Sequence, residues 1–178
     1  MPRFPRTRVR QLFLQADGAP SREERGAILE AATRILFEAV PGVTCEDQDV
    51  PHAANTEEID LLFWNDRKPR ALHFIDAPFL AECKNWAAKV SGQEIVVFAN
   101  SMRGRSCRDG ILIAANGITG DPGQLTEAHF EISVAARSGQ RILVLTRQEI
   151  ESFEKSADLV TLLKTKVLDV ARKGTKIA

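Results

Sequence analysis

Two apolar runs on either side of a helical segment constrain the fold of this chain most strongly. Residues 78–84 and 110–115 are short, nearly continuous apolar stretches, as expected of strands that are covered on both faces of a sheet. Between them, residues 91–104 repeat apolar residues at helical spacing, and Ser91 with Glu94 has the pattern of a capping box. Strand, helix and strand at this spacing predict a right-handed parallel crossover.

The segments before this unit predict a helix and further strands. Ser21 and Glu24 form a second capping-box pattern, which begins a helix with one apolar face that ends at Pro41-Gly42. Residues 58–64 combine apolar and β-branched or aromatic residues and predict a strand, and residues 71–75 predict a further short strand.

The remaining segments complete an α/β pattern. The polar stretch that follows residues 43–45 is expected to be a connector. After the crossover, the periodicity predicts a helix, a strand and two helices, at residues 124–138, 141–146, 147–154 and 157–171. This order predicts an α/β fold with a mixed central sheet flanked by helices.

The first twenty residues differ from the rest because they contain two early prolines and then a turn signal. We expect residues 1–20 to form an N-terminal arm, whose Leu12, Phe13 and Leu14 dock on the core or on a partner. Residues 21–178 are then expected to form a single domain, with a core at about 24–146 and C-terminal helices at 147–171.

The composition is that of an ordinary globular protein. The chain has 178 residues and zero net charge, a mild argument against a protein that coats nucleic acid non-specifically. It has neither an apolar run of the ~20 residues that span a bilayer nor the apolar stretch of a secretory signal, which predicts a cytoplasmic protein without membrane contact. Cys45, Cys83 and Cys107 are odd in number and widely spaced, which favours free thiols.

Three charged residues are unusual because they lie within or at the end of apolar strands. Glu82 and Lys84 end the run 78–84 and share one face of the strand, whereas Cys83 points to the other face. Asp60 lies inside the strand 58–64. Burying such charges is costly unless they are paired or bind a charged ligand. Two carboxylates suit Mg²⁺, which Mn²⁺ can replace, and Lys84 would orient a water or neutralise developing charge.

Other acidic and amide residues are further candidates for this site. Gln93 begins the helix after the Glu82 strand, so its first turn can face the same cleft. Glu30 lies beside the apolar stripe of the first predicted helix, where it could reach a metal or form a surface pair. Asp76 lies nearer to Glu82 in sequence than Asp60 does and is an alternative metal ligand, although its position just before Ala77-Pro78 suggests a turn.

These residues together resemble the PD-(D/E)xK nuclease superfamily, and its Mrr-like, restriction-endonuclease-like branch in particular. The resemblance covers roughly residues 24–146 and rests on Glu58-Ile59-Asp60, Glu82-Cys83-Lys84-Asn85-Trp86, Gln93 and the run 110–113. It implies an αβββαβ core and metal-dependent hydrolysis of phosphodiester bonds. The branch commonly has a tyrosine four residues after its glutamine, and this chain has Val97 there.

The same resemblance implies roles for individual residues. Asp60 and Glu82 correspond to the metal ligands, with Lys84 as the catalytic lysine. Gln93 corresponds to the glutamine of the following helix, and Glu30 to the glutamate of the first helix, a further candidate metal ligand.

The functional hypothesis is a Mg²⁺-dependent endonuclease that cuts DNA, as a restriction or phage-defence effector. No appended recognition domain is visible, so sequence specificity is expected to come from dimerisation, from a partner subunit or from nothing at all, and a homodimer or a larger complex is expected. Arg103, Arg105 and Arg108 are candidate nucleic-acid contacts, although a solvated surface is the usual interpretation of such a cluster. The alternative is a catalytically silent nuclease-fold module that binds nucleic acid or a partner protein.

Overall fold

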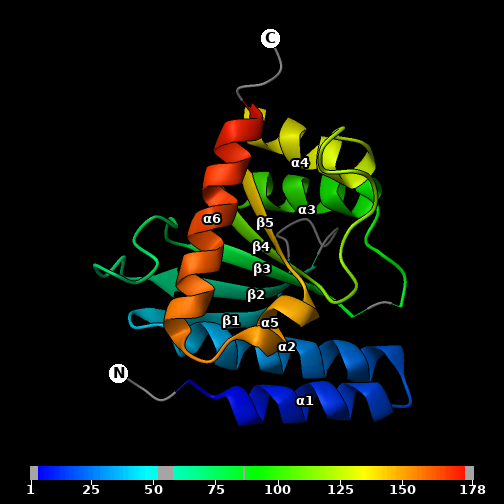
Figure 1. Cartoon of the computed structure of the whole chain (residues 1–178), viewed down its shortest axis with the longest axis vertical. Helices are drawn as coiled ribbons and strands as arrows, with labels where there is room; N and C mark the ends of the chain where they lie inside the picture. Colours follow the sequence, from blue (N-terminus) through cyan, green and yellow to red (C-terminus); the bar gives the residue numbers. More distant parts are fainter. Residues whose placement is uncertain (1–3, 52–57, 86, 175–178) are drawn as a thin grey trace.

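The computed structural model describes residues 4–51, 58–85 and 87–174, and shows a five-stranded sheet between two layers of helices (Figure 1). Trp86 of the motif lies outside the described residues. Among the described helices, none is both long and apolar enough to cross a membrane. The elements are α1 (Arg6–Gly18), α2 (Arg22–Glu38), β1 (Val43–Pro51), β2 (Glu58–Asn65), β3 (Phe79–Lys84), α3 (Gly92–Gly104), β4 (Asp109–Ala114), α4 (Glu127–Arg137), β5 (Arg141–Leu145), α5 (Arg147–Ser152) and α6 (Ser156–Gly174).

The strands follow the order of the chain across the sheet, β1-β2-β3-β4-β5. The pairs β1–β2 and β2–β3 are antiparallel, whereas β3–β4 and β4–β5 are parallel. Because α3 connects the parallel strands β3 and β4, the predicted parallel crossover is confirmed. The succession α2-β1-β2-β3-α3-β4 is the αβββαβ core that the resemblance implied, and the predicted mixed α/β sheet is also confirmed.

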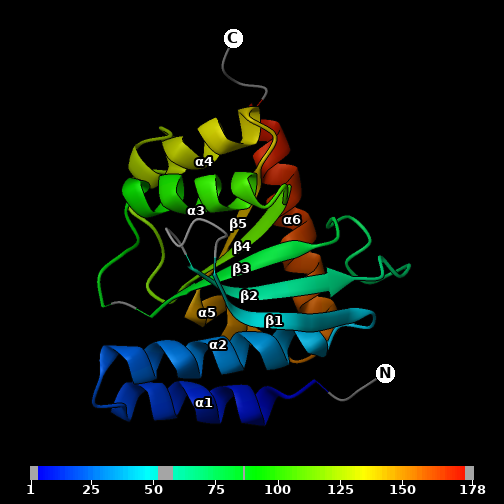
Figure 2. The same ribbon diagram turned by 180° about the vertical axis from the view of Figure 1, so that it is seen from behind.

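Each face of the sheet packs on its own group of helices. Helices α2 and α6 cover one face, with α1 packed on the outside of α2, and α3 and α4 cover the other face (Figure 2). Helix α3 can approach β4 closely because residue 110 is glycine, and a Cβ there would lie 2.8 Å from Phe98 Cζ. The predicted caps at the starts of α2 and α3 are present: Glu24 N donates to Ser21 Oγ (3.0 Å) and Ser91 N donates to Glu94 Oε2 (3.1 Å).

The predicted N-terminal arm is instead the helix α1, which packs against α2. Its buried residues recur at helical spacing, at Val9, Leu12, Phe13 and Ala16. Leu12 and Phe13 therefore dock on the core as expected, whereas Leu14 points to solvent with 68% of its surface exposed. The early prolines suggested an arm, but Pro5 stands at the N-cap of α1, a position that does not interrupt a helix.

Two segments beside the sheet also differ from the prediction. The polar stretch after residues 43–45 is not a connector, because it continues as β1 and pairs with β2 along the edge of the sheet. Residues 71–75 form turns rather than a strand. The Asn65 side-chain amide holds these turns by donating to the carbonyls of Leu72 and Ile75, at 2.8 Å each. At the other end of the chain, α6 continues past the predicted residue 171.

Candidate active site

The candidate active site lies where β2 and β3 separate. These strands pair only from Phe63↔Phe79 to Leu61↔Ala81, whereas β3 remains paired with β4 as far as Lys84. The start of β2 pairs instead with β1. The separation leaves the Cys83 amide without a β2 backbone acceptor, and Asp60 Oδ2 accepts its hydrogen bond at 2.6 Å. The predicted Asp60 is thereby fixed beside the Glu82 strand.

Glu82 and Lys84 form an ion pair on one face of β3, with Lys84 Nζ 2.5 Å from Glu82 Oε1. Their side chains are 11% and 24% exposed. Cys83 points to the opposite face, where its thiol donates to Thr33 Oγ1 at 3.4 Å under α2. Burial raises the pKa of the Cys83 thiol well above its usual value, so this residue is a neutral part of the core and not a nucleophile.

Burial and close charges shift the pKa values of all three site residues. Burial, followed by the charge of Asp60, raises the pKa of Glu82 to about 7, against the opposing effect of Lys84. Burial also raises the pKa of Asp60. Burial acts to lower the pKa of Lys84, but Glu82 and Asp60 outweigh it and the net shift is upward. Lys84 therefore stays protonated. A cation bound nearby would stabilise the ionised form of both carboxyl groups and so lower their raised pKa values.

Carboxylate oxygens are the ligands that a hard divalent cation prefers, so Asp60 and Glu82 fit such an ion. Within the described part of the chain, Glu82 Oε2 is buried and has no hydrogen-bond partner, which is costly unless a ligand contacts it. No group of three or more His, Cys, Asp or Glu side chains could hold a metal within this same part. One or two carboxylates nevertheless suffice for Mg²⁺, which usually keeps several waters and takes its other ligands from a phosphate.

Two cavities meet at this point, one on each side of the separating strands. The α2-side cavity has a volume of about 470 Å³, and its lining includes Glu30, Gln48, Asp49, Glu58, Asp60 and Lys84. The α3-side cavity has a volume of about 340 Å³, and its lining includes Glu58, Ile59, Glu82, Lys84, Glu94 and Phe98. Lys84 and Glu58 line both cavities, so they stand at the junction between the two carboxylates of the pattern.

Glu30, for which the sequence left open a metal contact or a surface pair, lies on the α2-side cavity. It reaches this cavity from α2, and Gln48 Nε2 of β1 donates to its Oε2 at 2.9 Å. Burial and the charge of Asp60 raise the pKa of Glu30, which places these two carboxylates in the same electrostatic environment.

The sequence argument gave Glu58 and Glu94 no role in the site itself. Glu58 precedes Asp60 by two residues in β2, and this alternation was the available signal for a second carboxylate on the same strand. Glu94 was interpreted only as a helix cap, although it also lines the α3-side cavity. Its pKa is lowered by the Ser91 hydrogen bonds and, more weakly, by the charge of Lys84.

Several predicted residues lie outside both cavities. Gln93 is exposed on the first turn of α3 and lines neither of them. Arg103 lies at the opposite end of α3, and Arg105 and Arg108 lie in the connection to β4. Asp76, the alternative ligand, precedes β3 and lies 3.6 Å from both Arg67 and Arg108, so the structure does not bring it to Glu82.

Comparison with known proteins agrees with this geometry. The Mrr catalytic family model, described as restriction endonuclease, matches residues 25–152, which run from the first turn of α2 to the end of α5 and include all of the site residues. The comparison with curated proteins gives no match. The matched segment carries a nuclease-type domain with separating strands, two carboxylates and a lysine. The chain therefore belongs to the Mrr-like restriction endonuclease family of the PD-(D/E)xK nuclease superfamily.

Proposed function

We propose that the chain is a metal-dependent endonuclease that hydrolyses phosphodiester bonds of DNA. One observation carries the proposal: Asp60, Glu82 and Lys84 meet where β2 and β3 separate, and Glu82 Oε2 is buried there without a hydrogen-bond partner in the described chain. The family description, restriction endonuclease, supports DNA as the substrate and restriction or phage defence as the setting.

Asp60 and Glu82 would hold the cation, Mg²⁺ first and Mn²⁺ as its replacement. The bound ion would supply positive charge to the phosphate and lower the pKa of the attacking water. The Cys83 amide occupies one carboxylate oxygen of Asp60 and so fixes the direction of the other. Lys84, which remains protonated, would donate to a phosphate oxygen and stabilise the charge that develops there.

The other predicted residues have secondary roles in this proposal. Glu30 and Glu58 face the α2-side cavity and would add negative charge next to the cation. Gln93 is exposed at the start of α3, where it would contact the nucleic acid outside the cavities. We also propose that the chain acts as a homodimer or within a larger complex.

A cleavage assay tests the proposal. The purified chain would be incubated with plasmid DNA, single-stranded DNA and RNA, each with Mg²⁺, Mn²⁺ or EDTA. We expect cleavage of DNA with either metal and none with EDTA, and a loss of at least about 100-fold in Asp60→Asn and Glu82→Gln. Asp169→Asn, at a half-exposed carboxylate on α6, is the matched control and should cleave as wild type does. Cleavage that persists in EDTA would contradict the proposal.

A catalytically silent module is the second candidate, and one observation favours it. Glu82 and Lys84 already neutralise each other at 2.5 Å, an arrangement that needs neither metal nor substrate. This candidate predicts that the chain binds DNA without cutting it under any of the conditions above, and that Asp60→Asn and Glu82→Gln leave the binding unchanged.

A further inference from the structure

A basic surface lies at the end of β3 that is opposite to the candidate active site. It consists of Arg67, Lys68 and Arg70, from the loop after β2, and Arg108, from the loop before β4. All four side chains belong to exposed residues. Strand β3 spans six residues, so the two ends are separated by about 17 Å at the usual rise of a strand.

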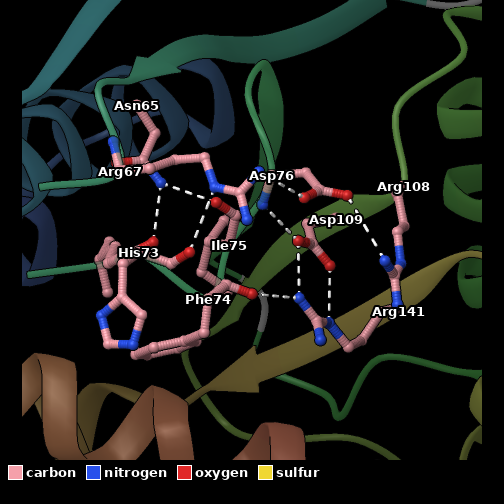
Figure 3. Close-up of polar contacts among 10 residues, drawn as sticks. Asn65, Arg67, His73, Phe74, Ile75, Asp76, Arg108, Asp109 and Arg141 are labelled. Carbon is pink, nitrogen blue, oxygen red and sulfur yellow. Dashed lines mark hydrogen bonds and ion pairs between the residues drawn. The ribbon is translucent and has the colours of Figure 1, made fainter. Parts of the chain in front are cut away.

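The loop that carries these residues is fixed by a buried ion pair (Figure 3). Asp109 is fully buried, and its carboxylate accepts two hydrogen bonds from Arg141, both at 2.7 Å, and a third from the Asp76 amide at 2.7 Å. Arg141 also donates to the Phe74 carbonyl at 2.7 Å. The turns after β2 are thus tied to the first residues of β4 and β5.

Arg67 is itself positioned by this network. Its backbone amide donates to Asn65 Oδ1 at 3.0 Å, and its Nε donates to the His73 carbonyl at 3.2 Å. Arg67 and Arg70 both have positive φ values, 54° and 66°, which residues other than glycine seldom adopt. The Arg67 side chain is therefore held in a defined position on the loop.

Asp76 lies between two of these side chains, 3.6 Å from Arg67 and 3.6 Å from Arg108. Both arginine side chains are more than half exposed and both contacts are long, so each pair is weak and is screened by salt, although the Asp76 side chain is only 35% exposed. Lys68 pairs with Asp66 in the same way. The basic surface thus has four cations beside two carboxylates, Asp66, which is about half exposed, and Asp76, which is about one third exposed. Asp109 and Arg141 neutralise each other beneath it.

We propose that this basic surface binds the phosphate backbone of duplex DNA, at a position separate from the point of cleavage. The proposal rests on the proposed function, because it takes the substrate of the active site as its ligand. Arg67 and Arg108 each face one oxygen of the same carboxylate, and they can exchange it for a phosphate, which guanidinium groups also bind through charge-assisted hydrogen bonds. Asp76 then acts as the internal competitor of the phosphate.

The acidic character of the active site gives such a contact a purpose. The α2-side cavity is lined by Glu30, Glu58 and Asp60, which repel a nucleic acid until a cation is bound. A cationic surface at the opposite end of β3 attracts the phosphate backbone of DNA without a bound metal. The active site at one end of β3 would then cut the DNA, and the basic surface at the other end would hold it.

Equilibrium binding of a fluorescent DNA duplex in EDTA tests the proposal, because the duplex stays uncut and the active site contributes no metal. We expect Arg67→Ala/Arg108→Ala to weaken binding at least about 10-fold at low salt and to reduce the slope of log K against log salt by about 2, since each phosphate contact contributes about 0.9. Asp76→Asn removes the competitor and should tighten binding about 3-fold or more. The matched control, Arg8→Ala/Arg137→Ala, removes two exposed helix arginines elsewhere and should change both quantities little.

The following results would contradict the proposal. If Arg67→Ala/Arg108→Ala binds as the control does, or Asp76→Asn binds more weakly than wild type, the proposal is wrong. If Arg67→Ala/Arg108→Ala does not fold, Lys68→Ala/Arg70→Ala provides the same comparison without touching the Asp76 pairs. Binding of polyglutamate, a probe for an acidic protein, is measured on the same variants. If Arg67→Ala/Arg108→Ala loses polyglutamate binding but binds the duplex as wild type does, the ligand is an acidic protein and the proposal is overturned. The cleavage assay is read separately, so a chain that binds as expected but never cuts would refute the proposed function alone.

Discussion

At the scale of single residues, the site depends on carboxylates that are buried beside one lysine. Sequence alternation was enough to place Glu82 and Lys84 on one face and Cys83 on the other, because β3 is a regular strand. Asp60 was identified because burying a charged side chain inside an apolar strand costs free energy. Gln93 and Glu94 could not be distinguished in this way, because their directions depend on how the first turn of α3 meets the sheet, and it is Glu94 that lines the cavity.

The raised pKa of Glu82 predicts how the stability of the metal-free protein depends on pH. The folded state holds the proton up to about pH 7, whereas the unfolded chain releases it near the usual glutamate pKa of 4.5. Between these values the folded state binds more protons, so its stability falls as the pH rises, by up to about 3 kcal/mol.

Urea denaturation in EDTA from pH 4.5 to 8 measures this dependence. We expect the free energy of unfolding of wild type to fall over this window relative to that of Glu82→Gln, which cannot titrate. A difference between the two proteins that stays constant with pH would show that Glu82 is not perturbed.

At the scale of secondary-structure elements, strong periodicity decided which segments were predictable. The helices α2 and α3 and the strands β3 and β4 followed from apolar spacing and caps. Strand β1 was missed because it lies at the edge of the sheet and its residues 46–49 are exposed, so it lacks the apolar run of a buried strand. Helix α1 was missed because its proline and turn signals were given more weight than its helical spacing.

Two adjacent residues of α1 test whether this helix belongs to the folded core. Phe13 is 2% exposed and lies under the guanidinium of Arg147, whereas Leu14 is 68% exposed. We expect Phe13→Ala to lower the free energy of unfolding by about 3–5 kcal/mol, and Leu14→Ala to change it by less than about 0.5 kcal/mol. Equal effects in chemical denaturation would mean that α1 does not dock as described.

The connection between β4, β5 and the turns after β2 depends on the buried pair of Asp109 and Arg141. Removing one partner leaves the other charge buried and unpaired, so we expect Asp109→Ala to destabilise the protein by about 3–5 kcal/mol. Asp169→Ala removes the carboxylate of an exposed pair on α6 and should cost less than about 1 kcal/mol. Similar costs for the two substitutions, measured by thermal or urea unfolding, would contradict the assignment of Asp109.

At the scale of the whole molecule, the net charge is zero, but acidic and basic side chains gather at opposite ends of β3. Acidic side chains gather where β2 and β3 separate, and basic side chains gather at the start of β3. Sequence analysis identified Arg108 as a candidate contact, but Arg67 and Arg70 join it only through the turns that Asn65 and Asp109 hold. Such a surface forms from residues about 40 positions apart, which no local pattern reveals.

The central claim is that Asp60, Glu82 and Lys84 form a metal-dependent catalytic site, and Lys84 provides its most direct test. The measurement is the single-turnover rate of DNA cleavage with saturating Mg²⁺, for wild type, Lys84→Ala and the exposed-lysine control Lys164→Ala. We expect Lys84→Ala to lose at least about 100-fold in rate while Lys164→Ala stays within about twofold of wild type. Equal rates for Lys84→Ala and Lys164→Ala would contradict the account.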